Sequence, residues 1–458
     1  MGGRCLGPPI LRPNGRPFAV PSRFTGASVW TGAAGETSAT GEGTGGTVRV
    51  TMMSAWQFGL RCHDIGAALA PADIEVAGLG LEPLLATADA AGLAVAVRGR
   101  GAVADAHALG AGRDAVELLE RTGLVELVDT SGGEVVSFIE RVPDHRELYE
   151  TLGQAWLEDG ADGFALGATR LVHHLAEGPA PVDTLTEELG ISARDVPDLL
   201  EVLSACGLVR SVATPGGALL YSPLLAAERP GAVTGVLKTH GPEGIDGELR
   251  AVEQRQGTVV GRGHAPLDQA AGLGLVPVVA LSEAGGVERA FAVVPGGDAL
   301  DVAIERKAVL ERATALLACC RAAQEDGLVD DEGAGAVLAA LAGYEGPAGG
   351  RAPGGERSVL ERLGLIGWHR GRPRLVPTAD NREALALARR WLGPPVGAPA
   401  DPETCAGVVG RPGRLASAVH WAHRHQGTGS PDPGYVRAVS VLAGRRRLAH
   451  AFDDVAAR

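Results

Sequence analysis

The segment from Pro181 to Pro223 constrains the fold more than any other part of this chain. Its apolar residues first recur at intervals of three and four, which predicts a short helix. That helix should end at Gly190, since glycine readily takes the left-handed conformation of a helix C-terminus. A second helical pattern covers 192–205, and residues 208–221 then alternate around a Pro-Gly-Gly turn, which is typical of a β-hairpin. The predicted order is therefore helix, turn, helix, hairpin.

This order recurs along the chain. A Gly-Leu-Val or Gly-Leu-Ile triplet follows an apolar helical pattern at 123–125, 207–209 and 364–366, and each triplet leads into a short hairpin and a proline. Repeated agreement of this kind indicates one module used several times. Hydrophobic residues make up 45% of the chain, so it can bury full-sized cores. We therefore predict a mainly α fold with small β-hairpins, an α+β class, built from tandem modules.

The modules divide the chain into predicted segments. Residues 1–52 lack apolar periodicity, so we expect them to be disordered or a mis-annotated extension, with the native start at Met52 or Met53. Residues 226–272 are rich in glycine and predict a long loop. The remaining division is a first module at 53–145, a second at 146–228, a Gly-rich loop with a two-stranded hairpin and a long helix at 229–330, a third, degenerate module at 331–395, and a linker with a basic helical tail at 396–458.

Residues Leu148 to Leu225, with their LxxxLG and LLxxLxxxGLV patterns, resemble the winged helix-turn-helix superfamily. The resemblance implies that the second helix of the motif, here Ser192–Ala205, enters the DNA major groove while the hairpin, or wing, touches the backbone. The outward positions of this helix carry one Arg against three carboxylates, and DNA phosphates are negative. The second module is therefore predicted to contact protein in preference to DNA. The outward residues are Arg194, Asp195, Asp198 and Glu201.

The C-terminal part of the chain has the opposite charge. From residue 346 onward there are 17 Arg and 9 Asp or Glu, although the whole chain carries a net charge of −13. Such asymmetry favours an anion-binding end, and Arg at a wing tip suits contact with the DNA backbone or minor groove. The alternative is a solvated basic surface. The predicted DNA-binding residues are Arg357, Arg362, Arg370, Arg372 and Arg374.

Two other interpretations stay open beside a DNA-binding transcriptional regulator. The first is a winged-helix adaptor that binds only protein. The second follows from a resemblance of the stretch around Asp183 to the dimerisation domain of SAM-dependent O-methyltransferases, of which the chain would be a divergent relative. A cofactor-binding half needs a strand ending in a Gly-rich turn, and Val259–His264 is the nearest candidate. We predict no enzyme activity, no catalytic residue, no cofactor and no metal site.

Histidine and cysteine patterns agree with that interpretation. His173 and His174 are expected as one packed and one exposed side chain, and the six cysteines, which lack metal-ligand spacing, as buried reduced thiols. No stretch approaches the ~20 apolar residues that span a bilayer, so we expect a cytoplasmic protein without a membrane partner. We also predict a homodimer or another protein partner, with the dimer contact on the helix within 298–323 or on the second module.

Overall fold

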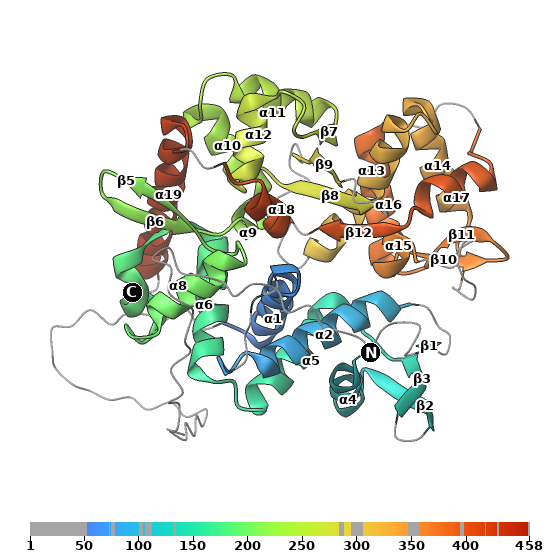
Figure 1. Ribbon diagram of the computed structural model, residues 1–458, viewed down its shortest axis with the longest axis horizontal. Helices are drawn as coiled ribbons and strands as arrows, with labels where there is room; N and C mark the ends of the chain where they lie inside the picture. Colours follow the sequence, from blue (N-terminus) through green and yellow to red (C-terminus); the bar gives the residue numbers. More distant parts are fainter. Residues whose placement is uncertain are drawn as a thin grey trace, which may run out of the picture.

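The computed structural model describes residues 53–456, apart from residues 73, 75–77, 100–103, 106–111, 132–133, 284–287, 295–305, 347–356, 394–397, 417 and 428–429. The predictions for residues 1–52 lie outside this part. Helices dominate, and the strands form small sheets of two to four strands (Figure 1). The predicted class, mainly α with small β-hairpins, is confirmed.

The N-terminal part packs four helices beside a small sheet. The helices are α1 (Ala55–Leu69), α2 (Glu82–Val97), α4 (Arg113–Arg121) and α5 (His145–Glu158). The sheet joins β1 (Ala104–Asp105), β2 (Val125–Ser131) and β3 (Glu134–Glu140) in the order β1-β3-β2. A Cβ on Gly59 would lie 2.1 Å from the Tyr149 carbonyl oxygen, and one on Gly153 1.9 Å from that of Ala55. Only glycine permits so close a crossing of α1 and α5.

The middle part follows the predicted order. Its elements are α6 (Gly163–Glu177), β4 (Ala180–Pro181), a short 3-10 turn, α7 (Leu185–Leu189), α8 (Val196–Ala205), β5 (Arg210–Thr214) and β6 (Gly217–Tyr221). Gly190 ends α7 with a left-handed φ of 62°. The next helix begins at Val196 and not directly after Ser192, because Pro197 occupies its first turn, where the missing N–H is not needed. The sheet order is β4-β6-β5.

Residues 226–272 do not form the long loop that we predicted. They belong to α9 (Leu224–Glu228), α10 (Pro230–His240), α11 (Ile245–Gln254), β7 (Thr258–Val259) and α12 (Ala265–Gly272), which precede β8 (Val278–Glu283) and β9 (Glu288–Ala292). The loop prediction was wrong because the large apolar residues here are few, but nearly all of them are buried in the core. Those that are at most 1% exposed are Val233, Val236, Leu237, Ile245, Leu249, Val252 and Leu267.

The next part is α13 (Lys307–Glu325), α14 (Asp331–Gly343), α15 (Val359–Arg362), β10 (Ile366–His369), β11 (Arg372–Leu375) and α16 (Ala379–Leu392). The long helix predicted at 298–323 is present from Lys307 onward, and its predicted start lies outside the described residues. Every residue of α13 from 315 to 323 is buried. This part of the helix therefore has no free face for the dimer contact that we predicted there.

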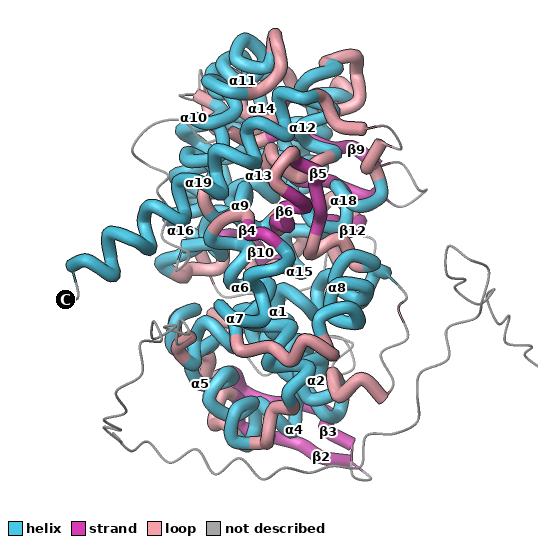
Figure 2. The backbone as a smooth tube through the Cα atoms, turned by 90° about the vertical axis from the view of Figure 1, so that its left-hand side faces the viewer, coloured by secondary structure: helices cyan, strands magenta, loops and turns pink. Residues whose placement is uncertain are grey.

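Residues 396–458 contain helices, as predicted for the basic helical tail, but they pack against the rest of the molecule. They form α17 (Pro402–Val409), β12 (Gly413–Ala416), α18 (Ala418–Arg424) and α19 (Pro433–Ala456). β12 pairs with β8, and Trp421 and Tyr435 are buried against the helices that precede β8. The helical character of the tail was predicted, whereas its packing through these two aromatic residues was not, because few apolar residues mark it. The C-terminal end of α19 extends away from the body (Figure 2).

One arrangement recurs four times among the described residues, and we call it the helix–hairpin unit. A first strand or bridge precedes a helix, a Gly-Leu-Val or Gly-Leu-Ile triplet ends the helix, and a hairpin follows whose second strand pairs with the first strand. The triplet glycines, Gly123, Gly207, Gly274 and Gly364, all have φ between 64° and 80°. The four units cover 104–140, 180–221, 258–292 and 345–375. Sequence reasoning found three and missed the third, although Gly274-Leu275-Val276 carries the same triplet.

Candidate functional site

The hairpin of the fourth unit carries the predicted basic residues on one face. In its register Trp368 faces Pro373 and His369 faces Arg372, and directly opposed residues of an antiparallel pair point to the same side. Trp368 and Pro373 are buried on the inner face. On the outer face, His369 and Arg372 are exposed and Arg374 is half-buried. The alternation therefore places the cationic side chains on the outer face of the hairpin. The hairpin itself lies at the edge of the molecule (Figure 1).

The tip of this hairpin is conformationally unusual. Arg370 and Gly371 have φ of 51° and 74°, the pattern of a type I′ turn, in which Asn or Gly normally takes the first position. Arg370 is the one non-glycine residue with a positive φ in the part of the chain that the structure describes. The left-handed conformation costs a residue with a Cβ about 1–2 kcal/mol. Arg370 is exposed, so burial of its side chain does not offset this cost.

The other two predicted residues lie nearby. Arg362 is exposed on α15, and Arg357 is half-buried just before Ser358, which caps the same helix. Within the described residues no carboxylate lies within ion-pair distance of Arg362, Arg370, Arg372 or Arg374. By contrast, Arg382 on α16 holds Glu345 with Nε–Oε1 and Nη2–Oε2 distances of 2.9 Å. The cationic surface is thus not neutralised by described neighbours, and we call it the basic hairpin (residues 362 and 369–374).

The first two units carry exposed carboxylates on their helices. On α8, Asp198 and Glu201 are exposed, as predicted, and on α4 the exposed residues include Glu117 and Glu120. Carboxylates on these helices would repel DNA phosphates. If this chain binds nucleic acid, the basic hairpin is therefore the better surface of the two.

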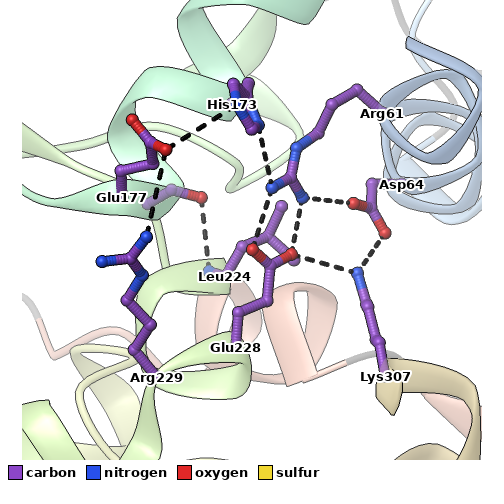
Figure 3. Close-up of polar contacts among 9 residues, drawn as sticks. Arg61, Asp64, His173, Glu177, Leu224, Glu228, Arg229 and Lys307 are labelled. Atoms are coloured by element: carbon purple, nitrogen blue, oxygen red, sulfur yellow. Dashed lines mark hydrogen bonds and ion pairs between the residues drawn. The ribbon is translucent and has the colours of Figure 1, made fainter. Parts of the chain in front are cut away.

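A buried ion-pair network joins three parts of the chain (Figure 3). Arg61 on α1 donates two hydrogen bonds of 2.5 and 2.8 Å to Glu228 on α9. It also donates to Asp64 at 2.7 Å. Lys307, at the start of α13, contacts Asp64 and lies 3.5 Å from Glu228. All four side chains are at most 11% exposed. We call these four residues the central network; its two cations balance its two anions.

His173 borders the central network. Arg61 Nη2 lies 3.4 Å from His173 Nδ1, so this ring nitrogen must accept and the ring is neutral, with its other nitrogen toward Glu177. Burial, together with the Arg61 charge, lowers the pKa of His173 to about 4. His174 is also buried, where we expected one histidine to be exposed. The difference arises because Arg446 of α19 and Glu188 of α7 cover it.

The central network was not predicted, since its members are far apart in sequence and only the fold brings them together. The one signal was a pair of charged residues, Arg61 and Asp64, inside an apolar helical pattern. Asp64 and Glu228 each have cationic partners, so neither is a free base aimed at a substrate. The arrangement is therefore better suited to holding α1, α9 and α13 together than to proton transfer.

Comparisons with known proteins identify no relative: no family model, no curated protein and no solved structure matches this chain. Among the described residues, no group of three or more His, Cys, Asp or Glu side chains has the geometry to hold a metal ion. None of the described helices combines the length and apolar character that crossing a bilayer requires. The five described cysteines are buried and unpaired.

Proposed function

We propose that this protein is a non-catalytic, DNA-binding regulator whose helix–hairpin units are winged helices, and that the basic hairpin contacts DNA. Arg370 is the observation that carries the proposal, because an exposed Arg occupies a turn position that disfavours it. Arg372 and Arg374 extend the same charge along one face of β11. Guanidinium groups suit phosphate oxygens and narrow minor grooves.

The order of elements in residues 163–221 supports the winged-helix assignment. A helix, a short strand, two helices joined at Gly190 and a hairpin follow one another, and the short strand pairs with the second hairpin strand. In winged helices the hairpin lies beside the reading helix and touches the DNA backbone. In this chain α15 is only four residues long, so the fourth unit would rely on its wing more than on a reading helix.

Binding of random-sequence duplex DNA at two salt concentrations tests the proposal. Contact with several phosphates predicts affinity that falls steeply as salt rises. The slope of log K against log salt is negative, and each lost contact makes it less negative by about 0.9. Replacing Arg370, Arg372 and Arg374 with Ala should therefore weaken binding. It should also make the slope less negative by about 3.

A matched control removes the same charge elsewhere. The exposed residues Arg113, Arg141 and Arg250 each pair with a carboxylate, and their triple Ala variant changes the net charge equally. It should bind DNA like the parent protein. Equal losses in both triple variants, or none in either, would contradict the role of the basic hairpin.

The carboxylates on α4 and α8 favour a second candidate, an adaptor that binds a protein through these helices. In that case the parent protein would not bind duplex DNA even at low salt. Replacing Asp198 and Glu201 with Asn and Gln would then reduce recovery of a partner from the native host, while the basic-hairpin variant would not.

A further inference from the structure

A second concave surface lies away from the basic hairpin. It opens between the loop around β7 and the C-terminal half of α13, and its free volume is about 310 Å³. Pockets of a few hundred Å³ are the size that small ligands occupy. Three arginines from three different segments line it: Arg255 at the end of α11, Arg262 in the β7–α12 loop and Arg321 on α13.

Arg321 is unusual because its guanidinium is buried, with the residue 6% exposed. Its Nε donates to the Gln256 carbonyl at 2.9 Å, and its Nη1 donates to Gln324 at 2.9 Å and Asp331 at 3.1 Å. The described residues give its Nη2 no hydrogen-bond acceptor. Nη2 is not among the fully buried atoms that lack a partner, so it is accessible from the pocket and can still donate to an anion.

The carboxylates around the pocket do not balance its cations. A single oxygen of Asp331, Oδ1, accepts from Arg255 at 3.2 Å, from Arg321 at 3.1 Å and from Gln324 at 2.8 Å. Arg262 pairs with Glu325. Three guanidinium groups thus share two carboxylates, and His264 also lines the pocket.

The loop that carries Arg262 has a defined shape. Gly261 and Gly263 on either side of it both have φ of 92°, and Asp268 accepts a hydrogen bond from the Gly261 N–H at 2.7 Å. The start of α12 is already occupied, because Glu248 accepts from the Leu267 N–H. The anion-binding capacity of the pocket therefore comes from its side chains and not from a helix dipole.

We propose that this pocket binds a small phosphorylated metabolite, with its phosphate group between Arg255, Arg262 and Arg321. Arginine donates in a planar fork that matches phosphate oxygens, and such charge-assisted hydrogen bonds are about twice as strong as neutral ones. The pocket is formed by the start of the third helix–hairpin unit together with α13 and the end of α11, and none of its lining residues belongs to the basic hairpin. The assignment does not depend on the proposed function.

Calorimetric titration of the full chain with pyrophosphate, at ionic strength held constant with sodium chloride, tests the site. We expect saturable binding of one pyrophosphate per chain. Arg255→Ala and Arg262→Ala should each raise the Kd at least tenfold. Both side chains are more than 60% exposed, so neither change should impair folding, which an unfolding curve checks.

Arg250→Ala is the matched control, because Arg250 lies on α11, which Arg255 directly follows, pairs with Asp246 and does not line the pocket. Its Kd should equal that of the parent. No saturable binding, or an equal loss in the control, would overturn the proposal. It also fails if duplex DNA displaces pyrophosphate and Arg255→Ala weakens duplex binding as much as the basic-hairpin variant does, since the pocket would then belong to a nucleic-acid surface.

Discussion

Arg370 couples a local conformational cost to the proposed contact with DNA. Asn tolerates the left-handed region better than Arg, so Arg370→Asn should raise the free energy of unfolding by about 1 kcal/mol. The same change should weaken binding to duplex DNA, because a guanidinium is lost at the tip. Urea denaturation and fluorescence anisotropy measure the two effects. A variant that gains stability without losing affinity would show that the tip does not touch DNA.

His173 makes folding sensitive to pH. Its pKa is about 4 in the folded protein against 6.5 in the unfolded chain, so the unfolded chain takes up the proton first. The resulting stabilisation is fully present above pH 6.5 and is lost as the pH falls toward 4, at most about 3 kcal/mol. Arg61, Glu177, Glu228 and His174 face this ring and contribute to its pKa.

Urea denaturation between pH 7 and 4 isolates this contribution. The parent protein should lose more stability over this range than His173→Gln does, whereas His369→Gln, which changes an exposed histidine, should behave like the parent. His174 and His145 also have lowered pKa values and add to the slope of both proteins. Parallel curves for the parent and His173→Gln would contradict the assignment.

At the scale of single elements, the crossing of α1 and α5 depends on Gly59. A Cβ there would meet the backbone of α5, which cannot move aside like a side chain, so Gly59→Ala should destabilise the protein by about 3 kcal/mol. Gly92 in α2 provides the control, because a Cβ there meets nothing within 4 Å. Gly92→Ala should stabilise by up to about 1 kcal/mol through helix propensity. Thermal or urea unfolding of both variants checks the pair, and equal effects would contradict the close crossing.

The sequence contained much of the element pattern. Periodicity and Gly-Leu-Val triplets located three helix–hairpin units, because local patterns determine where a helix ends and a hairpin begins. Residues 226–272 were mistaken for a loop, since a helix there needs only a few buried apolar residues once it packs on β8 and β9. The basic hairpin was predicted as exposed charge, but the left-handed Arg370 was not, since it depends on the backbone of the turn. The central network and the Arg255 pocket required distant segments to meet, which no local pattern reveals.

At the scale of the whole molecule, the central network connects α1, α9 and α13. Glu228→Gln would leave Arg61 and Lys307 with Asp64 as their one remaining network anion, so it should cost about 3–5 kcal/mol in unfolding free energy. Glu117→Gln, which breaks an exposed pair with Arg113, should cost at most about 0.5 kcal/mol. Urea denaturation of the two variants makes the comparison. Similar small losses would show that the network contributes little.

A double variant distinguishes the effect of an unbalanced buried charge from the effect of losing the Arg61–Glu228 ion pair. Arg61→Met with Glu228→Leu removes one cation and one anion and leaves the Asp64–Lys307 pair intact. It should recover most of the stability lost in Glu228→Gln, because buried pairs are often replaceable by apolar residues. A double variant as unstable as Glu228→Gln would mean that the geometry of the pair, and not its charge balance, holds the parts together.

The pairing of β12 with β8 determines when this sheet can be completed during translation. β12 lies roughly 130 residues after β8, and at about 5–20 residues per second a ribosome needs on the order of ten seconds to make the intervening chain. Throughout that interval the edge of β8 opposite β9 lacks its partner strand β12. Open strand edges invite pairing with other chains. A nascent chain stalled before Gly413 would expose that edge to neighbours on the same polysome.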